Sequence, residues 1–274
     1  MRYGLPYQGS KSRIAEWVVE HLPAAPVLVD IMCGGGAVSH AAVLAGKWDR
    51  VVMNDVNGMA DVFVKAARGE YADYSFVPDR EQFHALKDCD PLVSLLYSFG
   101  NNRTAYLWGR DIEPVKVAAS RMLSAGTLRE RRRYWLEFCR ALYAYVDGVG
   151  GLPNQLERLE GLERLERLER LEGSCLDYRQ VELPPDVVVY VDPPYEGSRC
   201  DAYEGFAFDE FHEWLDTVPN LTVISEYTCP PHCVEVARKE HYTTMAANAN
   251  KLKRVEKLFV PERQIDEYRE RINM

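Results

Sequence analysis

Residues 26–55 read PVLVDIMCGGGAVSHAAVLAGKWDRVVMND, and the order of apolar, small and acidic residues in this stretch decides the fold. Residues 26–31 form a short apolar run that is typical of a buried strand, and three glycines follow it closely. Residues 37–45 are rich in small side chains and have a helical pattern, and residues 51–54 form a second apolar run. Strand, helix and strand joined by short connections make a βαβ unit, so the stretch predicts a parallel sheet.

The pattern outside this unit predicts a long helical region and then more strands. Residues 56–150 have a mostly helical pattern, which is clearest at 92–99 and 128–147. Further along the chain we expect strands at 174–178, 187–191 and 221–225, a helix around 209–217, and a closing hairpin within 243–260. The fold class is therefore α/β, with an open sheet that a mostly helical insertion interrupts.

The composition is that of a soluble globular protein. The chain has 274 residues, of which 47% are hydrophobic, and this is enough for a large core with a second lobe. There is no apolar run of about 18 residues, and the first residues lack the apolar region of a signal peptide, so we expect neither a membrane span nor secretion. Seven cysteines without a framework spacing favour reduced thiols and a cytoplasmic protein.

The charge of the chain bears on nucleic-acid binding. A formal net charge of -9 argues against a broad, non-specific grip on nucleic acid, but it leaves room for a local basic face. The segment 129–135 combines four arginines with Tyr134 and Trp135. It is either such a basic face or an ordinary solvated helix face, and the sequence leaves both open.

Residues 156–172 repeat Leu-Glu-Arg with a period of three. Three residues turn an α-helix by about 300°, so the leucines would spiral around a helix instead of forming one stripe. The composition nevertheless favours a helix, and helices with three residues per turn are rarely long. The conformation stays open, and the repeat favours a spacer or packing arm over a specific binding element.

The turn after the first strand has the properties of a cofactor site. Glycines let the backbone approach a ligand closely, and the N-terminus of the next helix offers free N–H groups. Asp55, at the end of the second strand, can accept hydrogen bonds from ribose hydroxyls. The turn is neither a Gly-x-Gly-x-x-Gly motif nor a phosphate loop. Asp30 before the glycines would repel a pyrophosphate, and it suits the positive charge of S-adenosylmethionine.

Asp192-Pro193-Pro194-Tyr195 is the sharpest motif of the chain. It follows the apolar run 187–191, at the strand end where open α/β sheets bind ligands. The prolines fix the backbone, so the Asp192 carboxylate and the Pro193 carbonyl project in set directions, and Tyr195 can stack on a planar ring. Two acceptors and a stacking face suit an exocyclic amine. The alternative is a strand-ending turn in which the acid caps the backbone.

These motifs and their order resemble the Dam-type (alpha-group) N6-adenine-specific DNA methyltransferases. The segments that carry the resemblance are 7–11, 30–36, 54–55, 99–104, 177–178 and 192–195, with looser likeness at 225–227 and 255–259. The resemblance implies a Rossmann-like methyltransferase sheet and methyl transfer from S-adenosylmethionine to N6 of a flipped adenine in double-stranded DNA. It also implies a catalytic domain at 1–68 and 173–274 and a target-recognition insertion at 69–150. The repeat is not part of the family pattern, and we expect it to form a separate arm at 151–172.

The resemblance and the residue chemistry together give the expected site. The expected catalytic residues are Asp192, Pro193, Pro194 and Tyr195. The expected cofactor-binding residues are Tyr7, Lys11, Asp30, Met32, Gly34, Gly36, Asp55, Asp177 and Tyr178, and Lys11 could also line the target pocket. The expected target-binding residues are Asn102, Arg103 and Tyr203.

Other functions stay open at this point. We expect no metal, because the cysteines and histidines between 229 and 241 lack a clean second ligand pair. The same chemistry could act on cytosine N4, on an RNA adenine or on a glutamine amide. A DNA-binding or partner-binding protein without turnover is the third alternative.

Overall fold

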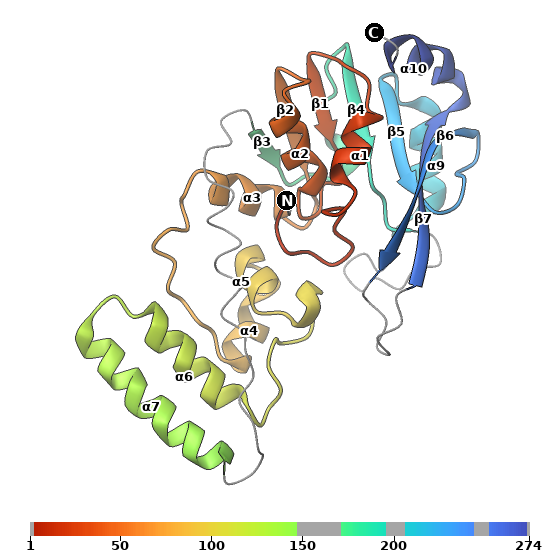
Figure 1. Ribbon diagram of the computed structural model, residues 1–274. Coiled ribbons are helices and arrows are strands. Elements are labelled where there is room, and N and C mark those ends of the chain that lie inside the picture. The colour runs from red at the N-terminus through yellow and green to blue at the C-terminus, as the bar shows by residue number, and fades with distance from the viewer. Residues whose placement is uncertain (1–2, 147–170, 196–205, 244–251, 273–274) are drawn as a thin grey trace. The chain divides into compact units, whose positions relative to one another are not determined.

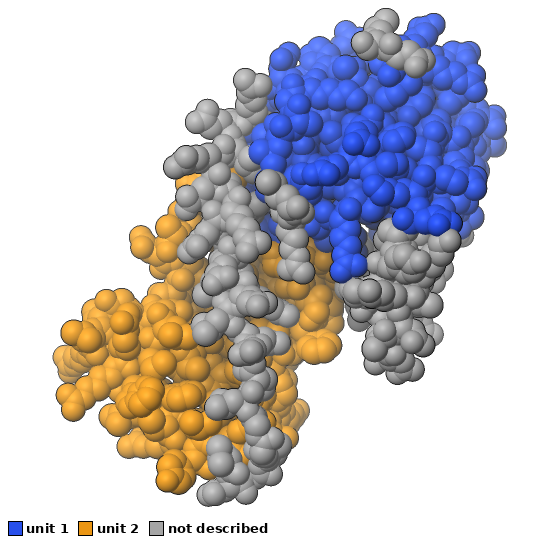
Figure 2. All heavy atoms as spheres, in the orientation of Figure 1, with its two compact units in different colours: residues 1–5, 9–64, 168–274 blue, residues 6–8, 65–167 orange. Residues whose placement is uncertain are grey.

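The computed structural model describes residues 3–146, 171–195, 206–243 and 252–272, and Figure 1 shows their course. The chain divides into two compact units, which Figure 2 distinguishes by colour. The first unit comprises Met1–Leu5, Gly9–Val64 and Leu168–Met274, and the second comprises Pro6–Gln8 and Lys65–Arg167. The assignment of these units to catalysis and target recognition stays a prediction.

The described part of the first unit contains a seven-stranded sheet with the order β3-β2-β1-β4-β5-β7-β6. Its strands are β1 (Val27–Asp30), β2 (Arg50–Asn54), β3 (Leu171–Ser174), β4 (Val187–Val191), β5 (Leu221–Glu226), β6 (Cys233–Thr243) and β7 (Leu252–Pro261). The first five strands pair in parallel, and β7 pairs antiparallel with both β5 and β6. The strand order reverses between β1 and β4, which is where open α/β sheets bind their ligands.

The core of the first unit forms because the central strands are apolar on both faces. All five residues of β4 are buried, as expected for a parallel strand that is covered on both sides. Phe211 and Leu215 of α9 (Phe208–Thr217) pack with Val189, Val191 and Phe259 in one apolar cluster. The other helices of this unit are α1 (Ala15–Glu20), α2 (Ala37–Ala45) and α10 (Ile265–Ile272). The predicted Rossmann-like α/β class is confirmed.

The second unit is helical in its described part. After α3 (Met59–Ala67), which begins in the first unit, come α4 (Arg80–Leu86), α5 (Pro91–Leu96), α6 (Glu113–Ser124) and α7 (Leu128–Val146). Asp79 and Gln82 form a capping box at the start of α4, and Asp90 caps α5 just before a proline at its first position. None of the described helices is long and apolar enough to cross a membrane.

The Asn54 side chain ties three segments of the first unit together. Its amide nitrogen donates to the carbonyls of Ile31 (3.0 Å) and Leu176 (2.9 Å). Its oxygen accepts from the Ser174 hydroxyl (2.8 Å) and the Leu176 amide (3.0 Å). The residue is 1% exposed, so these four bonds satisfy its whole hydrogen-bonding capacity away from water.

The hydrogen bonds of Asn54 explain why the strand predicted at 174–178 was wrong. The strand expected at 174–178 is β3 at Leu171–Ser174 instead. The chain leaves the sheet after Ser174, because both backbone groups of Leu176 bond to the Asn54 side chain. Leu171, which was expected to close the repeat arm, is buried and pairs with Val51. Residues 147–170, which hold most of the repeat, lie outside the described residues.

The predicted hairpin within 243–260 begins about ten residues too late. Its first strand, β6, already starts at Cys233 and forms the edge of the sheet. Edge strands commonly carry charged residues, and Glu235, Arg238, Lys239 and Glu240 dilute the apolar pattern of β6. The position of the hairpin therefore depended on its partner β7 and could not be taken from an apolar run.

Replacing Asn54 by alanine should destabilise the first unit strongly. The change leaves buried backbone groups of Ile31 and Leu176 without partners, and we expect a loss of about 3 kcal/mol in the free energy of unfolding. Ser174→Ala removes only one of the four bonds and should cost about 1 kcal/mol. Urea denaturation of both variants measures the difference. Equal losses of stability in the two variants would show that Asn54 does not hold these segments together.

Candidate functional site

The carboxyl ends of three parallel strands gather acidic residues at one edge of the sheet. Asp30 is the last residue of β1, and its register partners are Met53 of β2 and Tyr190 of β4. Asp55 follows the end of β2, and Asp192 follows the end of β4. The parallel pairing therefore brings both predicted motifs, the glycine turn and Asp-Pro-Pro-Tyr, to one place.

Asp30 is a buried carboxyl group with one oxygen to spare. It is 1% exposed, and its Oδ2 accepts a hydrogen bond from the Ser39 hydroxyl. Its Oδ1 is buried and has no hydrogen-bond partner among the described residues. Burial raises the pKa of Asp30 to about 7; the charges of Asp192 and Asp55 act in the same direction, and Ser39 opposes them. Such a group calls for a donor or a positive charge, and the cationic cofactor predicted from the sequence fits it.

The glycine turn is built for a close backbone approach. Gly34 and Gly36 have φ values of 48° and 69°, in the left-handed region that favours glycine. A Cβ atom on Gly36 would lie 2.5 Å from Met53 Cε and 2.7 Å from Phe63 Cδ2, so this position has no room for a side chain. Gly36 is also the N-cap of α2 and supplies no side-chain cap to that helix end.

The other predicted cofactor residues of the first unit are already engaged in local contacts. Asp55 is 2% exposed, and its Oδ1 accepts from the backbone amides of Asn57 (3.0 Å) and Met59 (3.4 Å). Met32 is partly buried against the apolar cluster of the core. These contacts fix both side chains at the sheet edge.

Asp177 and Tyr178 are also held by neighbours. Both oxygens of Asp177 accept from the Arg179 guanidinium, at 2.8 and 2.9 Å, and this pairing holds the pKa of Asp177 below its usual value. The Tyr178 ring meets those of Phe211 and Trp214 edge to face, with centroids 5.8 and 5.3 Å apart. An adenine ring placed here would find an aromatic wall.

Lys11 neutralises the expected catalytic carboxylate. Its Nζ donates to both oxygens of Asp192, at 2.7 and 2.8 Å, and the two side chains are only 11% and 20% exposed. Burial raises the pKa of Asp192, and Lys11 acts against that rise. Burial also acts to lower the pKa of Lys11, but the nearby carboxylates of Asp192 and Glu256 outweigh it and raise that pKa. Lys11 is therefore protonated at neutral pH, and it forms a largely buried pair with Asp192.

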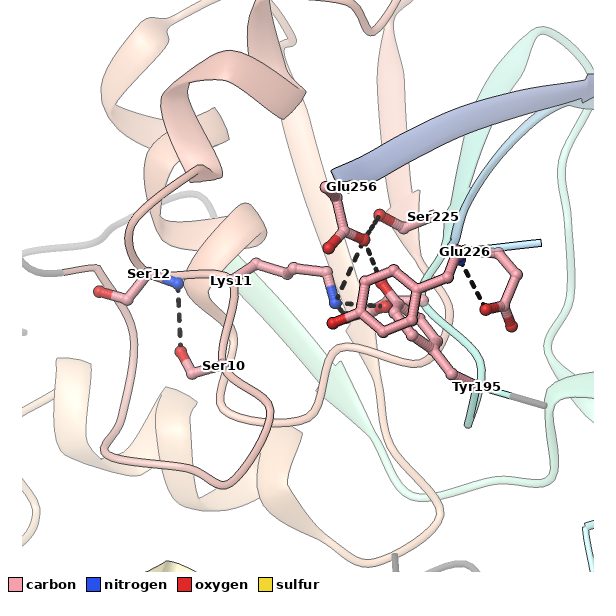
Figure 3. A network of polar contacts seen from close by, with 9 residues as sticks. Ser10, Lys11, Ser12, Tyr195, Ser225, Glu226 and Glu256 are labelled. Atoms are coloured by element: carbon pink, nitrogen blue, oxygen red, sulfur yellow. Dashed lines mark hydrogen bonds and ion pairs between the residues drawn. The ribbon is translucent and has the colours of Figure 1, made fainter. Parts of the chain in front are cut away.

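A second carboxylate, Glu256 of β7, lies near the ammonium of Lys11 (Figure 3). Its Oε1 accepts from the Ser225 hydroxyl at 3.0 Å and from the Tyr195 hydroxyl, and it lies 3.8 Å from Lys11 Nζ. The Lys11 ammonium lies 4.6 Å from the centroid of the Tyr195 ring, and Tyr227 packs edge to face against that ring at 4.4 Å. Lysine, tyrosine and both carboxylates therefore form one network.

The comparisons with known proteins agree with these motifs. Residues 7–98 match the sequence profile of the D12 class N6 adenine-specific DNA methyltransferase family. The matched segment ends at residue 98. It includes Lys11, the glycine turn and Asp55, and it confirms the family resemblance inferred from the motifs. Asp192 and the C-terminal half of the sheet lie beyond the matched residues.

The other comparisons add little. No curated protein sequence matches the chain. Among solved structures, the chain is similar to a Haemophilus influenzae protein provisionally described as a methylase. The identity is 11%, the likeness covers 94% of this chain and 91% of that one, and the TM-score is 0.33. A likeness with so low a TM-score supports no conclusion about the function of this protein.

The predicted target-binding residues are described apart from this site or lie outside the described residues. Asn102 and Arg103 lie in the second unit. The Asn102 side chain accepts from the amides of Thr104 and Ala105, and Arg103 Nε donates to Ser94 Oγ at 3.1 Å. Tyr7 also clusters with the second unit, and Tyr203 lies outside the described residues. Their proposed roles stay predictions.

The sequence did not single out Ser39, Ser225, Tyr227 or Glu256 as site residues. Ser225 and Tyr227 lie in a segment with only loose likeness to the family, and so does Glu256. Their importance comes from pairing between β5 and β7, which places Ser225 opposite Leu258 and so diagonally across from Glu256. Among the described residues, no group of three or more histidine, cysteine or acidic side chains could hold a metal ion.

Binding of S-adenosylmethionine should strengthen as the pH rises through about 7. Below that pH Asp30 is mostly protonated and neutral, and above it the carboxylate attracts a cationic ligand, so we expect about a tenfold gain in affinity between about pH 6 and about pH 8. Calorimetric titration measures this gain, and binding near pH 7 should release a proton. In the Asp30→Asn variant this gain in affinity should be smaller, because only titration of S-adenosylmethionine itself can then change the affinity with pH. An equal pH dependence in both proteins would contradict the assignment.

Proposed function

We propose that this protein is a DNA methyltransferase that transfers a methyl group from S-adenosylmethionine to the N6 amine of a flipped adenine. One observation carries the proposal: Asp192 and the glycine turn lie at the same edge of the sheet, where β1 and β4 end. The two sites are close enough that the charge of Asp192 raises the pKa of the buried Asp30. The D12 class match of residues 7–98 supports adenine N6 as the acceptor.

The cofactor half of the proposed site rests on charge and backbone geometry. S-adenosylmethionine supplies an electrophilic methyl group when it is bound. Asp30 would accept a hydrogen bond from its cationic amino group through the buried Oδ1. Gly34 and Gly36 would let the backbone approach it, and Asp55 would bind the ribose, as acids at this strand end commonly do. The proposed lining is completed by Tyr7, Lys11, Met32, Asp177 and Tyr178.

The target half would hold the amine and the base. Hydrogen bonds from N6–H to the Asp192 carboxylate and to the Pro193 carbonyl would localise the nitrogen lone pair, which is otherwise delocalised into the ring. The Tyr195 ring would stack on the base, and its hydroxyl is anchored on Glu256. Such a reaction requires the adenine to leave the duplex, because the amine is not accessible in the stack.

A basic face of α7 is the proposed contact to the DNA backbone. In the second unit, α7 packs against α6 with one side, and Glu137 and Ala141 of that side line a groove with Val117 and Ala118. The exposed residues of α7 include Trp135 (51%) and Tyr143 (78%). They also include three arginines whose side chains form no hydrogen bond or ion pair with other described residues, Arg129, Arg132 and Arg140. Arginines interleaved with aromatic residues suit phosphates and unstacked bases.

Methyl transfer to DNA is the direct test. We expect the protein to transfer tritiated methyl groups to mixed-sequence duplex DNA, and nucleoside analysis should find N6-methyladenine. Asp192→Asn should lower the rate by about 10²–10⁴-fold, because the group that holds the amine loses its charge. The matched control is Asp186→Asn, an exposed acid just before β4. Methylated cytosine or RNA would indicate the other acceptors, and no incorporation by the wild type would refute the proposal.

The α7 face makes a second, independent prediction. Replacing Arg129, Arg132 and Arg140 by glutamine should weaken DNA binding and lower its salt dependence, by about 0.9 in the logarithmic slope for each phosphate that the variant no longer neutralises. Fluorescence anisotropy at several salt concentrations measures this slope. Arg68→Gln, at an exposed arginine outside α7, serves as the control. A slope unchanged by the triple substitution would exclude α7 from the interface.

A further inference from the structure

The proposed catalytic carboxylate, Asp192, is already paired with Lys11, whose surroundings Figure 3 shows. Both oxygens of Asp192 accept from Lys11 Nζ, at 2.7 and 2.8 Å. The Lys11 ammonium contacts both oxygens, so a substrate amine has to compete with it for the same two acceptor atoms. The Lys11 side chain is 11% exposed, so its charge cannot simply turn to water without a large rearrangement.

Glu256 is the acceptor that stands ready for this ammonium. It is 1% exposed, and its Oε1 lies 3.8 Å from Lys11 Nζ. A shift of about 1 Å would bring the two atoms to the length of a charge-assisted hydrogen bond. The hydroxyls of Ser225 and Tyr195 already hold that oxygen in place, so Glu256 need not move.

The Tyr195 ring defines the path of the shift. Lys11 Nζ lies 4.6 Å from the centroid of this ring, and the tyrosine hydroxyl ends on Glu256. A cation that slides along an aromatic face keeps a favourable electrostatic contact while it changes partners. The lysine can therefore exchange one carboxylate for the other without losing its surroundings.

We propose that Glu256 is the second partner of Lys11 and a positioning residue, which takes over the ammonium when a substrate amine occupies Asp192. The proposal rests on the proposed methyl transfer only for the identity of that amine. Without a substrate, Lys11 occupies Asp192 and compensates its buried charge. With a substrate, the Lys11 ammonium pairs with the Glu256 carboxylate instead. Both Asp192 oxygens can then accept hydrogen bonds from the substrate amine.

The first test needs neither substrate nor activity. Asp192→Asn imitates a catalytic acid that no longer holds the lysine, and we expect Lys11 Nζ to move to hydrogen-bonding distance of Glu256 in a crystal structure of this variant. In the same background, Glu256→Gln should lower the folding equilibrium constant at least about tenfold more than it does in the wild type, because Lys11 then lacks any carboxylate. Denaturant unfolding of the four proteins measures this coupling.

Glu226→Gln provides the matched control for the unfolding experiment. Glu226 is a neighbouring buried carboxylate, 6% exposed, that accepts from the backbone amide of Tyr227. Its substitution should add to Asp192→Asn without coupling. If Glu256→Gln is equally additive, or if Lys11 stays beside residue 192 in the variant, the exchange is wrong. If no methylation is found at all, the unfolding experiment still tests whether Glu256 is the second partner of Lys11.

Activity supplies a second measurement that does not require the Asp192 variant to fold. Glu256→Gln should lower kcat for methyl transfer about tenfold or more, while the affinity for S-adenosylmethionine stays within about twofold. Glu256→Asp keeps the charge and should restore most of the rate, which a purely structural role of the glutamate would not predict. Equal rates of the two variants would overturn the proposal, whereas inactivity of the wild type would instead count against the proposed function.

Discussion

The site is governed by the cost of burying several carboxylates beside a single ammonium. Asp30, Asp55, Asp192 and Glu256 are each largely removed from water, and Lys11 is the cation that pairs with two of them. An unpaired buried charge costs several kcal/mol, so each acid needs its own compensation. Backbone amides serve Asp55 and hydroxyls serve Glu256, whereas Asp30 keeps one oxygen without a partner among the described residues. The remaining negative charge would favour the cationic and amine-bearing ligands of the proposed function.

The parts of this site that could be predicted depend only on the apolar runs of the sequence and on the parallel arrangement of the strands. The run 26–31 with its glycines places Asp30 at a strand end, and 187–191 does the same for Asp192. Parallel strands end at the same edge, so two motifs that lie far apart in the chain had to meet there. This inference does not depend on side-chain contacts, and for this reason the fold class and the meeting of the two motifs could be predicted from the sequence.

The parts that could not be predicted depend on contacts between distant residues. Lys11 and Asp192 are 181 positions apart, and nothing in either segment requires that the ammonium covers the carboxylate. Glu256 looks like any acid in an alternating strand until β5 and β7 are paired in register. In the same way β3 ends where the Asn54 side chain captures Leu176, an interaction across 122 positions that outweighs the strand propensity of the residues after Ser174.

An acidic site and the proposed anionic substrate would require two separate binding surfaces in the chain. The sheet edge would repel DNA phosphates, and the chain as a whole carries a formal charge of -9. Only a neutral base has to enter the site, where the acids act at hydrogen-bonding distance. Salt screens charges that are more than about 8–10 Å apart, so the repulsion between these acids and distant phosphates is weak. The phosphates must then be held by another surface, and the arginine-rich face of α7 in the second unit has the required sign. Under the proposed function, two separate surfaces would let the site stay acidic enough to attract a sulfonium while the other surface binds the DNA backbone.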